Sequence, residues 1–273
     1  MELDLYQIDA FITDAKGFSG NPAAVIPLSE WINDWVMQAI AAENNLSETA
    51  FFVKQADDTY HIRWFTPSAE VDLCGHATLA AAHVIHQNLG DTRPVLPMTC
   101  GVGPLAVRVH TGAAETEYEL DFPLRVPELV CDKSLAAQVS YALGMPVNSL
   151  HRSRDIIAEL STAAEVRDFK PDMTALTLLD AFALIITAPS DDPAFDFVSR
   201  FFAPSFGVLE DPVTGSSFCS LAPMWAEKLG KTTLRARQCS RRGGDVALQI
   251  DGDRVYIRGR TFAYLRGVIR LPL

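Results

Sequence analysis

The chain has 273 residues, of which 48% are hydrophobic and 21% charged, and a formal net charge of −11 at pH 7. This composition excludes a disordered chain and allows one large domain or two modest ones. A chain with this negative charge repels phosphate backbones, and we therefore expect no nucleic-acid partner. A small anionic substrate can still bind at local dipoles or single cations.

The N-terminal sequence and the cysteines favour a cytoplasmic protein. The start "MELDLYQIDA" lacks a basic segment followed by an apolar run, so we expect no signal peptide. No apolar run reaches the roughly 20 residues of a membrane span, so we expect no membrane partner. The five cysteines are odd in number and widely spaced, which favours reduced thiols over a disulfide framework.

Alternation of apolar and polar residues predicts most of the elements of the first half. A first helix is expected to begin with Ser29 as its N-cap and to end at Asn44, and a second to run from Gly75 to Leu89, before Gly90. We expect strands at 3–12, 23–28, 46–53, 60–67, 104–110 and 116–122.

The second half predicts fewer elements. One helix is expected over Ser134–Leu143, ended by Gly144, and another after Gly215, ended by Gly230. We expect strands at 175–179, 182–188, 235–240 and 262–271, and a hairpin over 246–257 around an Asp-Gly turn.

The segments "CGHATLAAAHVI" and "TGSSFCSLAPMWA" form a weak internal repeat, which a gene-duplicated protein with two lobes would contain. Each places glycine and small polar residues before an apolar helix: Gly75-His76 in the first and Gly215-Ser216 in the second. Unpaired N–H groups at a helix start bind anions, and glycine allows close approach, so the two starts could hold a carboxylate. The alternative is that small residues merely begin two buried helices.

Several side chains near these helix starts allow two interpretations each. His76 could be an acid–base group or a capping residue, and Cys74 could be an activated thiolate or a small buried apolar residue. Asp211 precedes a proline and could simply form a turn. His83 and His86 lie three residues apart, but without a third ligand we interpret them as surface histidines and expect no metal.

Glu48 is the most informative charged residue, because both faces of the predicted strand 46–53 are largely apolar. It should therefore lie within or at the rim of the core, where burial raises the pKa of a carboxyl group and suits it to proton transfer near neutral pH. A structural ion pair, for example with Arg63 in the neighbouring strand, is an equal alternative.

Five segments together resemble the phenazine-biosynthesis isomerase family (PhzF-like proteins), within the wider diaminopimelate epimerase-like fold. They are "GNPAAV" at 20–25, "NNLSETAFF" at 44–52, "RWFTPSAEVDLCGHATLAAAHVI" at 63–85, "EDPVTGSSFCSLAPMWAEKLGK" at 210–231 and "RQCSRRGGDVALQI" at 237–250. They occur in the order of the family and leave only the middle third without a match.

The resemblance implies an α+β fold of two pseudo-symmetric lobes, each a curved, mostly antiparallel sheet wrapped around a central helix. The N-terminal lobe would comprise 1–115, completed by the C-terminal strand 262–273, and the C-terminal lobe would comprise 116–261. The helices after Gly75 and Gly215 would be the two central helices. The family is commonly dimeric, so a homodimer is expected.

The resemblance also implies an isomerase that works without a metal or organic cofactor on a small, carboxylate-bearing substrate, for example a cyclic one. In the best-studied family reaction, which isomerises a dihydro-hydroxyanthranilate, a glutamate moves a proton between carbons of a conjugated system. The implied catalytic residues are Glu48, His76 and Asp211, and the implied substrate-binding residues are Gly75, Gly215 and Ser216.

Two alternatives keep the same fold. Related amino-acid epimerases and proline racemases use two thiols, one from each lobe, so a thiol-dependent racemase using Cys74 is the first. The second lobe reads "EDPVTG" at the matching place, without a cysteine, and we therefore interpret Cys74 as a packing residue. The second alternative is a protein that binds small molecules, or acts as a scaffold, without catalysis.

Overall fold

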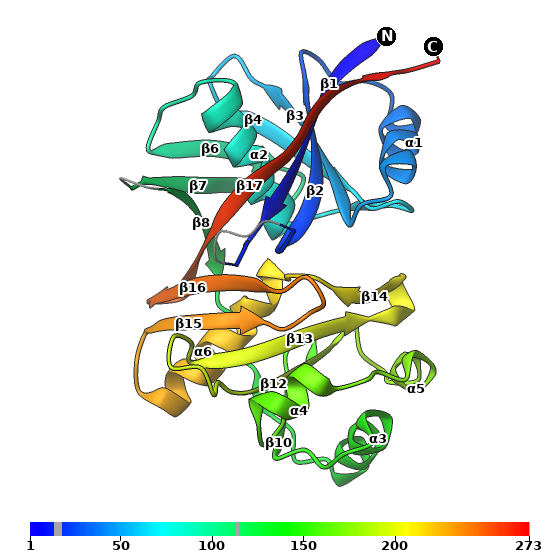
Figure 1. Cartoon of the computed structure of the whole chain (residues 1–273), viewed down its shortest axis with the longest axis vertical. Coiled ribbons are helices and arrows are strands. Elements are labelled where there is room, and N and C mark those ends of the chain that lie inside the picture. The colour runs from blue at the N-terminus through cyan, green and yellow to red at the C-terminus, as the bar shows by residue number, and fades with distance from the viewer. Residues whose placement is uncertain (14–17, 113–114, 273) are drawn as a thin grey trace. The chain divides into compact units, whose positions relative to one another are not determined.

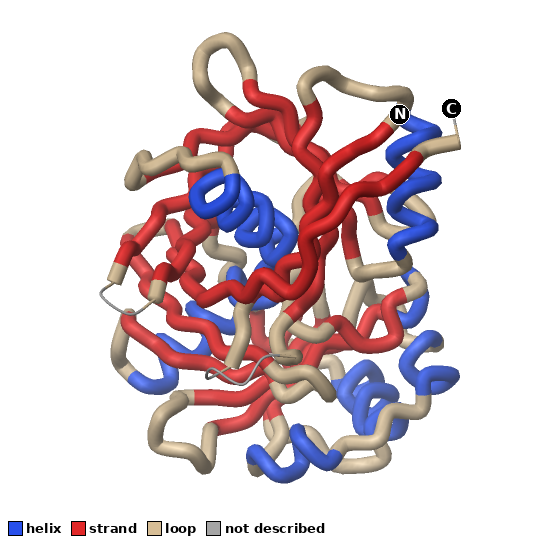
Figure 2. The backbone as a smooth tube through the Cα atoms, turned by 45° about the horizontal axis from the view of Figure 1, so that its top comes forward, coloured by secondary structure: helices blue, strands red, loops and turns tan. Residues whose placement is uncertain are grey.

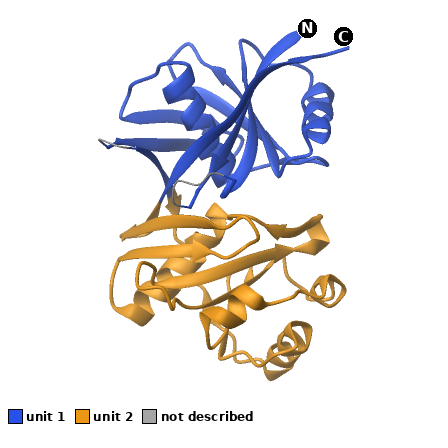
Figure 3. Ribbon diagram, viewed as in Figure 1, with its two compact units in different colours: residues 1–121, 258–273 blue, residues 122–257 orange. Residues whose placement is uncertain are grey.

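The computed structural model describes residues 1–13, 18–112 and 115–272. The chain folds into two compact units: unit 1 comprises residues 1–121 and 258–273, and unit 2 comprises residues 122–257 (Figure 3). The boundaries expected from the sequence, at 115/116 and 261/262, lie a few residues away. Among the described residues, no helix combines the length and the apolar character that crossing a membrane requires.

In its described residues, unit 1 combines strands with two α-helices and one short π-helix (Figure 1). Its strands are β1 (Glu2–Ala10), β2 (Asn21–Leu28), β3 (Glu48–Lys54), β4 (Tyr60–Phe65), β5 (Glu70–Val71), β6 (Val95–Cys100), β7 (Gly103–Thr111) and most of β8 (Thr116–Pro123) and β17 (Arg254–Arg270). Its helices are α1 (Asp34–Asn44), α2 (Gly75–His83) and the π-helix η1 (Val84–Asn88).

Unit 2 contains the same kinds of elements. Its strands are β9 (Glu128–Leu129), β10 (Ser149–Arg152), β11 (Ile156–Glu159), β12 (Leu184–Pro189), β13 (Phe197–Ala203), β14 (Val208–Asp211), β15 (Thr233–Gln238) and β16 (Gly244–Asp251). Its helices are α3 (Lys133–Leu143), α4 (Ala163–Asp168), α5 (Met173–Thr177) and α6 (Phe218–Leu229), with 3₁₀ turns η2 (Pro204–Phe206) and η3 (Gly215–Ser217).

Helix α2 is the buried centre of unit 1. Every residue from Gly75 to Ala82 is buried, and the helix packs against β1, β2, β3 and β7 (Figure 2). A helix that is apolar on all sides is stable only when it is enclosed, which explains the run of alanines. Its first turn, with His76, is therefore held in the interior of the unit.

Helix α6 occupies the matching place in unit 2. Its residues Phe218–Ala222 are buried, and it packs against β15 and β16. The 3₁₀ turn η3 leads into it, and Gly230 ends it in the left-handed conformation, at φ 65°. The predicted end at Gly230 is confirmed, because glycine adopts this backbone conformation without strain.

The two units share one order of strand pairing. In unit 1, β2–β3 and β4–β6 are parallel, while β3–β4, β4–β5 and β6–β7 are antiparallel. In unit 2, the pairs β11–β12, β12–β13, β13–β14, β13–β15 and β15–β16 repeat those directions in the same order. The buried helix precedes β6 in one unit and β15 in the other, so the weak sequence repeat reflects a repeated topology.

A side-chain group repeats as well. In unit 1, Arg63 Nε donates to Glu70 Oε1 at 2.7 Å, and the guanidinium lies 5.2 Å from the ring centre of Phe65. The same strands of unit 2 hold the same arrangement at 2.7 Å and 5.0 Å, built from Arg200, Glu210 and Phe202. These two groups show which residues of unit 1 and unit 2 occupy equivalent positions in the repeat.

Two predicted elements are wrong. Residues 175–179 are not a strand, because the Asp172 carboxylate accepts hydrogen bonds from the N–H groups of Thr174 and Ala175 and thereby caps helix α5. Helix α1 begins at Asp34, with Asn33 rather than Ser29 at the N-cap position. The first error arises where an apolar pattern is short and a capping carboxylate decides the start, whereas Asn33 makes no capping hydrogen bond with its side chain.

Candidate active site

Glu48 and His76 form a close pair in unit 1. Glu48 is the first residue of β3, and His76 lies in the first turn of α2, so that Glu48 Oε2 is 3.0 Å from His76 Nε2. His76 is 3% exposed, whereas the side chain of Glu48 is 17% exposed. Within the described residues, neither atom makes a hydrogen bond of good geometry. The pair therefore keeps polar capacity that a ligand can use.

Asn21 and Ser47 orient the imidazole. Asn21 Nδ2 lies 3.1 Å from His76 Nδ1, and Ser47 Oγ donates to Asn21 Oδ1 at 3.0 Å. An amide nitrogen can only donate, so Nδ1 accepts, and the proton of the neutral ring lies on Nε2, facing Glu48. This tautomer is assigned from the hydrogen-bond network.

Burial and charge set the protonation of this cluster. Burial, together with the Glu48 carboxylate, raises the pKa of the Cys74 thiol to about 11. Burial lowers the pKa of His76, but the charges of Cys74 and Glu48 outweigh it and raise that pKa well above its usual value. Because the thiol is protonated near neutral pH, Glu48 is the charge that matters for His76. A thiolate at Cys74 is therefore disfavoured.

The alternative ion pair between Glu48 and Arg63 does not form among the described residues. Arg63 instead binds Glu70, at 2.7 Å, and Asp34, at 2.8 Å. The carboxylate of Glu48 faces His76, so the interpretation of Glu48 as a merely structural partner of Arg63 is wrong. His76 is also more than a capping residue, because its ring nitrogens face Asn21 and Glu48.

The same cluster could hold a metal ion. The donor atoms of Glu48, Cys74 and His76 lie within 4.8 Å of one another. A thiol ligand must lose its proton on metal binding, and the raised pKa of Cys74 opposes that loss. The donor set therefore offers at most two ready ligands at neutral pH.

His83 and His86 are not surface histidines as predicted. Both are half-buried, and their ring centres lie 6.0 and 6.2 Å from that of Tyr118. His83 Nδ1 is 2.8 Å from Thr261 Oγ1, and burial lowers the pKa of His83 to about 4. The two histidines are therefore partly exposed and pack against Tyr118.

In unit 2, a buried glutamine fixes the loop that carries Asp211. Gln238 is fully buried, and its Nε2 donates to the carbonyl of Asp211 at 2.7 Å while its Oε1 accepts from Thr214 N at 3.0 Å. The hydroxyl of Thr214 donates to the Asp211 carboxylate. Asp211 is therefore held at the end of β14, just before Gly215 and Ser216.

Gly215 and Ser216 begin η3, so their N–H groups have no acceptor within the helix. Ser216 Oγ accepts a hydrogen bond from Arg154 Nη2 at 3.3 Å. The structure thus brings Gly75, His76 and Glu48 together in unit 1, and it brings Asp211, Gly215 and Ser216 together in unit 2.

Four residues of these clusters were not singled out from the sequence: Asn21, Ser47, Gln238 and Arg154. Asn21, Ser47 and Gln238 lie inside three of the family-like segments, "GNPAAV", "NNLSETAFF" and "RQCSRRGGDVALQI", so a signal for them existed. Arg154 lies in the middle third, where no family-like segment occurs, and its role follows only from the fold.

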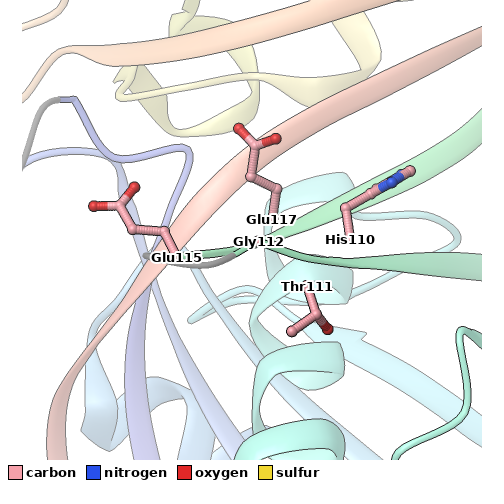
Figure 4. Close-up of a pocket in the computed structure, with 5 residues that line it drawn as sticks. All are labelled: His110, Thr111, Gly112, Glu115 and Glu117. Atoms are coloured by element: carbon pink, nitrogen blue, oxygen red, sulfur yellow. The ribbon is translucent and has the colours of Figure 1, made fainter.

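Two cavities lie elsewhere in unit 1. One of about 450 Å³ is lined by His110, Thr111, Gly112, Glu115 and Glu117, near the end of β7 (Figure 4). Another, of about 290 Å³, includes His83, Tyr118 and Arg260 in its lining. Neither is lined by Glu48 or His76, so the candidate site rests on the polar cluster and not on cavity size.

Known proteins are similar to this chain over nearly its whole length. Residues 8–267 match the model of the PhzC-PhzF family, described as phenazine biosynthesis-like protein. An uncharacterized isomerase of Pseudomonas aeruginosa is 44% identical, over 99% of this chain and 100% of that protein. The crystal structure of a phenazine biosynthesis protein of the PhzF family from Enterococcus faecalis gives a TM-score of 0.92 at 41% identity, over 99% of this chain and 100% of that chain.

More distant likeness concerns the fold alone. A hydroxyproline epimerase from Agrobacterium vitis, solved with bound trans-4-hydroxy-L-proline, gives a TM-score of 0.62 at 10% identity, over 98% of this chain and 92% of that one. The predicted α+β fold of the epimerase type is thereby confirmed.

Proposed function

Because this chain belongs to the PhzC-PhzF, phenazine biosynthesis-like family, we propose that it is an isomerase that moves a proton on a small anionic substrate, without a cofactor. The observation that carries the proposal is the buried contact of 3.0 Å between Glu48 Oε2 and His76 Nε2, with unused hydrogen-bonding capacity on both atoms. Relatives named as isomerases support the reaction class.

In this proposal Glu48 is first the base and then the acid. Its carboxylate takes a proton from one substrate carbon, and the electron pair spreads over the conjugated system. The Glu48 carboxyl group exchanges that proton with solvent and then delivers a proton to another carbon. His76 directs Nε2–H toward the reacting region and stabilises the negative charge that develops. Asn21 and Ser47 keep the imidazole in that orientation. No oxidant or reductant is required.

The internal repeat favours a single proton carrier. The residues that follow Glu48 and Ala183 pair with Phe65 and Phe202, the aromatic members of the two matching arginine groups. Glu48 and Ala183 are therefore equivalent positions, and Ala183 has no group that ionises. Cys219, near the start of α6, is buried, and burial raises its pKa to about 11. Unit 2 thus offers neither a carboxylate at the matching position nor a ready thiolate at Cys219.

The proposal keeps Gly75, Asp211, Gly215 and Ser216 as substrate contacts, on the strength of the family resemblance. Backbone N–H groups at a helix start suit a carboxylate or a developing oxyanion. Asp211, held in place by Gln238, would accept a hydrogen bond from a polar substituent. We propose a cyclic carboxylic acid with conjugated double bonds as the substrate class, and a cytoplasmic location for the reaction.

Deuterium uptake tests this function. The protein is incubated in D₂O with a panel of cyclic dienol carboxylic acids, including dihydro-hydroxyanthranilate, and carbon-bound deuterium is followed by NMR and mass spectrometry. We expect uptake with wild type and loss of at least roughly 100-fold in Glu48→Gln, since general acid–base catalysis contributes about that much or more. Cys74→Ser should retain uptake, and chelators should not affect it.

The alternatives give different results in the same assay. A non-catalytic binding protein would be favoured if wild type and Glu48→Gln took up deuterium equally, or not at all, into every acid that binds. Loss of uptake in Cys74→Ser, together with inactivation by a thiol-alkylating reagent, would restore the thiol-dependent racemase. Binding of the acids to Glu48→Gln, followed by calorimetry, shows that a loss of rate is not a loss of the site.

A further inference from the structure

Arg154 lies beside one of the proposed substrate contacts, in the turn between β10 and β11. Its Nη2 is 3.3 Å from Ser216 Oγ. Asp155, which is 1% exposed, accepts hydrogen bonds from Nε at 3.0 Å and from Nη2 at 3.1 Å. A buried carboxylate thus holds the guanidinium in one orientation beside Ser216.

An aromatic pair flanks the same guanidinium. The guanidinium carbon of Arg154 lies 4.4 Å from the ring centre of Phe182, which in turn lies 4.5 Å from that of Phe206. Phe182 is 37% exposed and Phe206 58% exposed. Two large aromatic side chains left in water beside a fixed cation form an apolar surface on which a flat ring could stack.

Arg154 still has a free edge. Among the described residues, its Nη1 has no hydrogen-bond partner, because Asp155 and Ser216 engage only Nε and Nη2. Ser216 accepts through Oγ, so its own hydroxyl proton remains available to a ligand. Two donors therefore have no acceptor among the described residues, and their side chains are already held by other hydrogen bonds, which reduces the entropy lost on binding.

A second arginine of unit 2 shows what a purely structural arginine looks like in this fold. Arg200 is 7% exposed, binds Glu210 through Nε and Nη2, and uses Nη1 for the carbonyls of Val166 and Phe169. All of its nitrogens are thus committed inside the protein. Arg154 differs in its exposure and in its free Nη1.

We propose that Arg154 determines substrate specificity, by binding the carboxylate of a planar, conjugated acid together with Ser216, while the ring of the substrate packs on Phe182 and Phe206. The carboxylate accepts from Arg154 Nη1 and from the Ser216 hydroxyl. This inference rests on the proposed function, because it names a residue that determines the specificity of that site.

The test compares acids with their amides, which have the same ring and no charge. Isothermal titration measures 2-aminobenzoate against 2-aminobenzamide in wild type, Arg154→Gln and Arg154→Lys. The matched control is Arg167→Gln, which removes an exposed arginine of unit 2 that is paired with Asp191. Thermal unfolding of each variant confirms that it is folded.

We expect wild type and Arg167→Gln to bind the acid roughly 10-fold more tightly than the amide, the difference that a charge-assisted hydrogen bond makes. Arg154→Gln should reduce this preference to less than about 3-fold, with Arg154→Lys in between, since a point charge replaces a planar donor pair. Phe206→Ala should weaken acid and amide alike.

Two results would overturn the inference: an unchanged acid preference in folded Arg154→Gln, or no preference for the acid in wild type. Each is distinguishable from failure of the proposed function. Acid preference depends on binding alone, so it should persist in Glu48→Gln, whereas deuterium uptake reports proton transfer. If wild type takes up deuterium but Arg154→Gln does not change the preference for acid over amide, the proposed isomerase function stands and only the role of Arg154 is excluded.

Discussion

The proton on His76 Nε2 is controlled by two residues that are remote in sequence. Asn21 donates to Nδ1 at 3.1 Å, and Ser47 fixes the amide of Asn21 at 3.0 Å. Without the amide, the neutral ring could carry its proton on either nitrogen, and only one of the two tautomers presents N–H to the reacting region. Asn21 is therefore a positioning residue in the proposed reaction.

We expect Asn21→Leu to lower kcat for deuterium uptake by at least roughly 10-fold, about 1.4 kcal/mol in the barrier, because Nδ1 loses its amide donor and keeps, among the described residues, only the weaker thiol of Cys74, at 3.5 Å. At a pH above the raised pKa of His76, where the ring is neutral, its ¹⁵N shifts should show a mixture of tautomers, a signature that a loss of packing alone would not produce. Ser47→Ala should have a smaller effect in the same direction. A variant with wild-type ¹⁵N shifts and a normal rate would contradict this role.

His76 and His83, both in helix α2, change the stability of the protein with pH in opposite directions. The raised pKa of His76 means that its contribution is complete below the unfolded pKa and is lost as pH rises through the folded pKa. His83 has a folded pKa of about 4 against 6.5 unfolded, so the unfolded chain binds its proton first. Stability therefore falls as pH decreases from about 6.5 to about 4.

We expect His83→Gln to remove part of this acid sensitivity. The free energy of unfolding in urea, measured between pH 4 and pH 7, should fall less steeply with acid in His83→Gln than in wild type, while the two curves run parallel above pH 7. His86, whose charge also acts on His83, is kept intact as a control. Identical slopes below pH 6.5 would show that His83 is accessible to protons in the folded protein.

At the scale of elements, the repeated arginine groups provide a matched comparison. Arg200 Nη1 and Nε are committed to Phe169 and Glu210 inside unit 2, whereas the group of Arg63 and Glu70 is more exposed, with 19% and 43% of these two side chains accessible. Breaking a buried pair leaves an uncompensated charge, but breaking an exposed one leaves a solvated charge.

We therefore expect Arg200→Met to destabilise the protein by about 3–5 kcal/mol and Arg63→Met by about 1 kcal/mol or less. Chemical denaturation of both variants under identical conditions measures the difference. Equal losses would mean that the two groups, although alike in geometry, do not differ in desolvation as their burial implies.

Local sequence signals predicted local structure well. The glycines that end α3 and α6 adopt positive φ, and the Asp-Gly turn joins β16 to β17, as expected. Contacts between segments that are remote in sequence could not be predicted. Whether the Glu48 carboxylate contacts Arg63 or His76 depends on which element lies beside the start of β3. Short strands such as β9 and β10 show too little alternation to be recognised, which explains the gaps in the middle third.

At the scale of the whole molecule, we propose a homodimer, as the family resemblance implies. Strand β17 exposes Phe262, Tyr264, Leu265 and Val268, and the ring of Tyr264 also contacts Phe18. A run of large apolar side chains in water is unusual for a monomer, and a second copy of the chain would cover it.

Sedimentation velocity tests this arrangement. We expect wild type to sediment as a dimer and Tyr264→Lys with Val268→Lys to sediment as a folded monomer, because two charges would be buried at the interface. Tyr141→Lys, at an 85% exposed aromatic residue of unit 2, should leave the dimer intact. A wild-type monomer, or a dimer that tolerates both lysines, would contradict the assignment.

The alanine at position 183, where the repeat places the counterpart of Glu48, bears on stereochemistry. With one group to lift a hydrogen and the same group to set it down, the hydrogen should re-enter on the side that it left. Such a catalyst can move a hydrogen from one carbon of its substrate to another. It should not interconvert mirror-image forms of the substrate, however closely its backbone follows that of an epimerase.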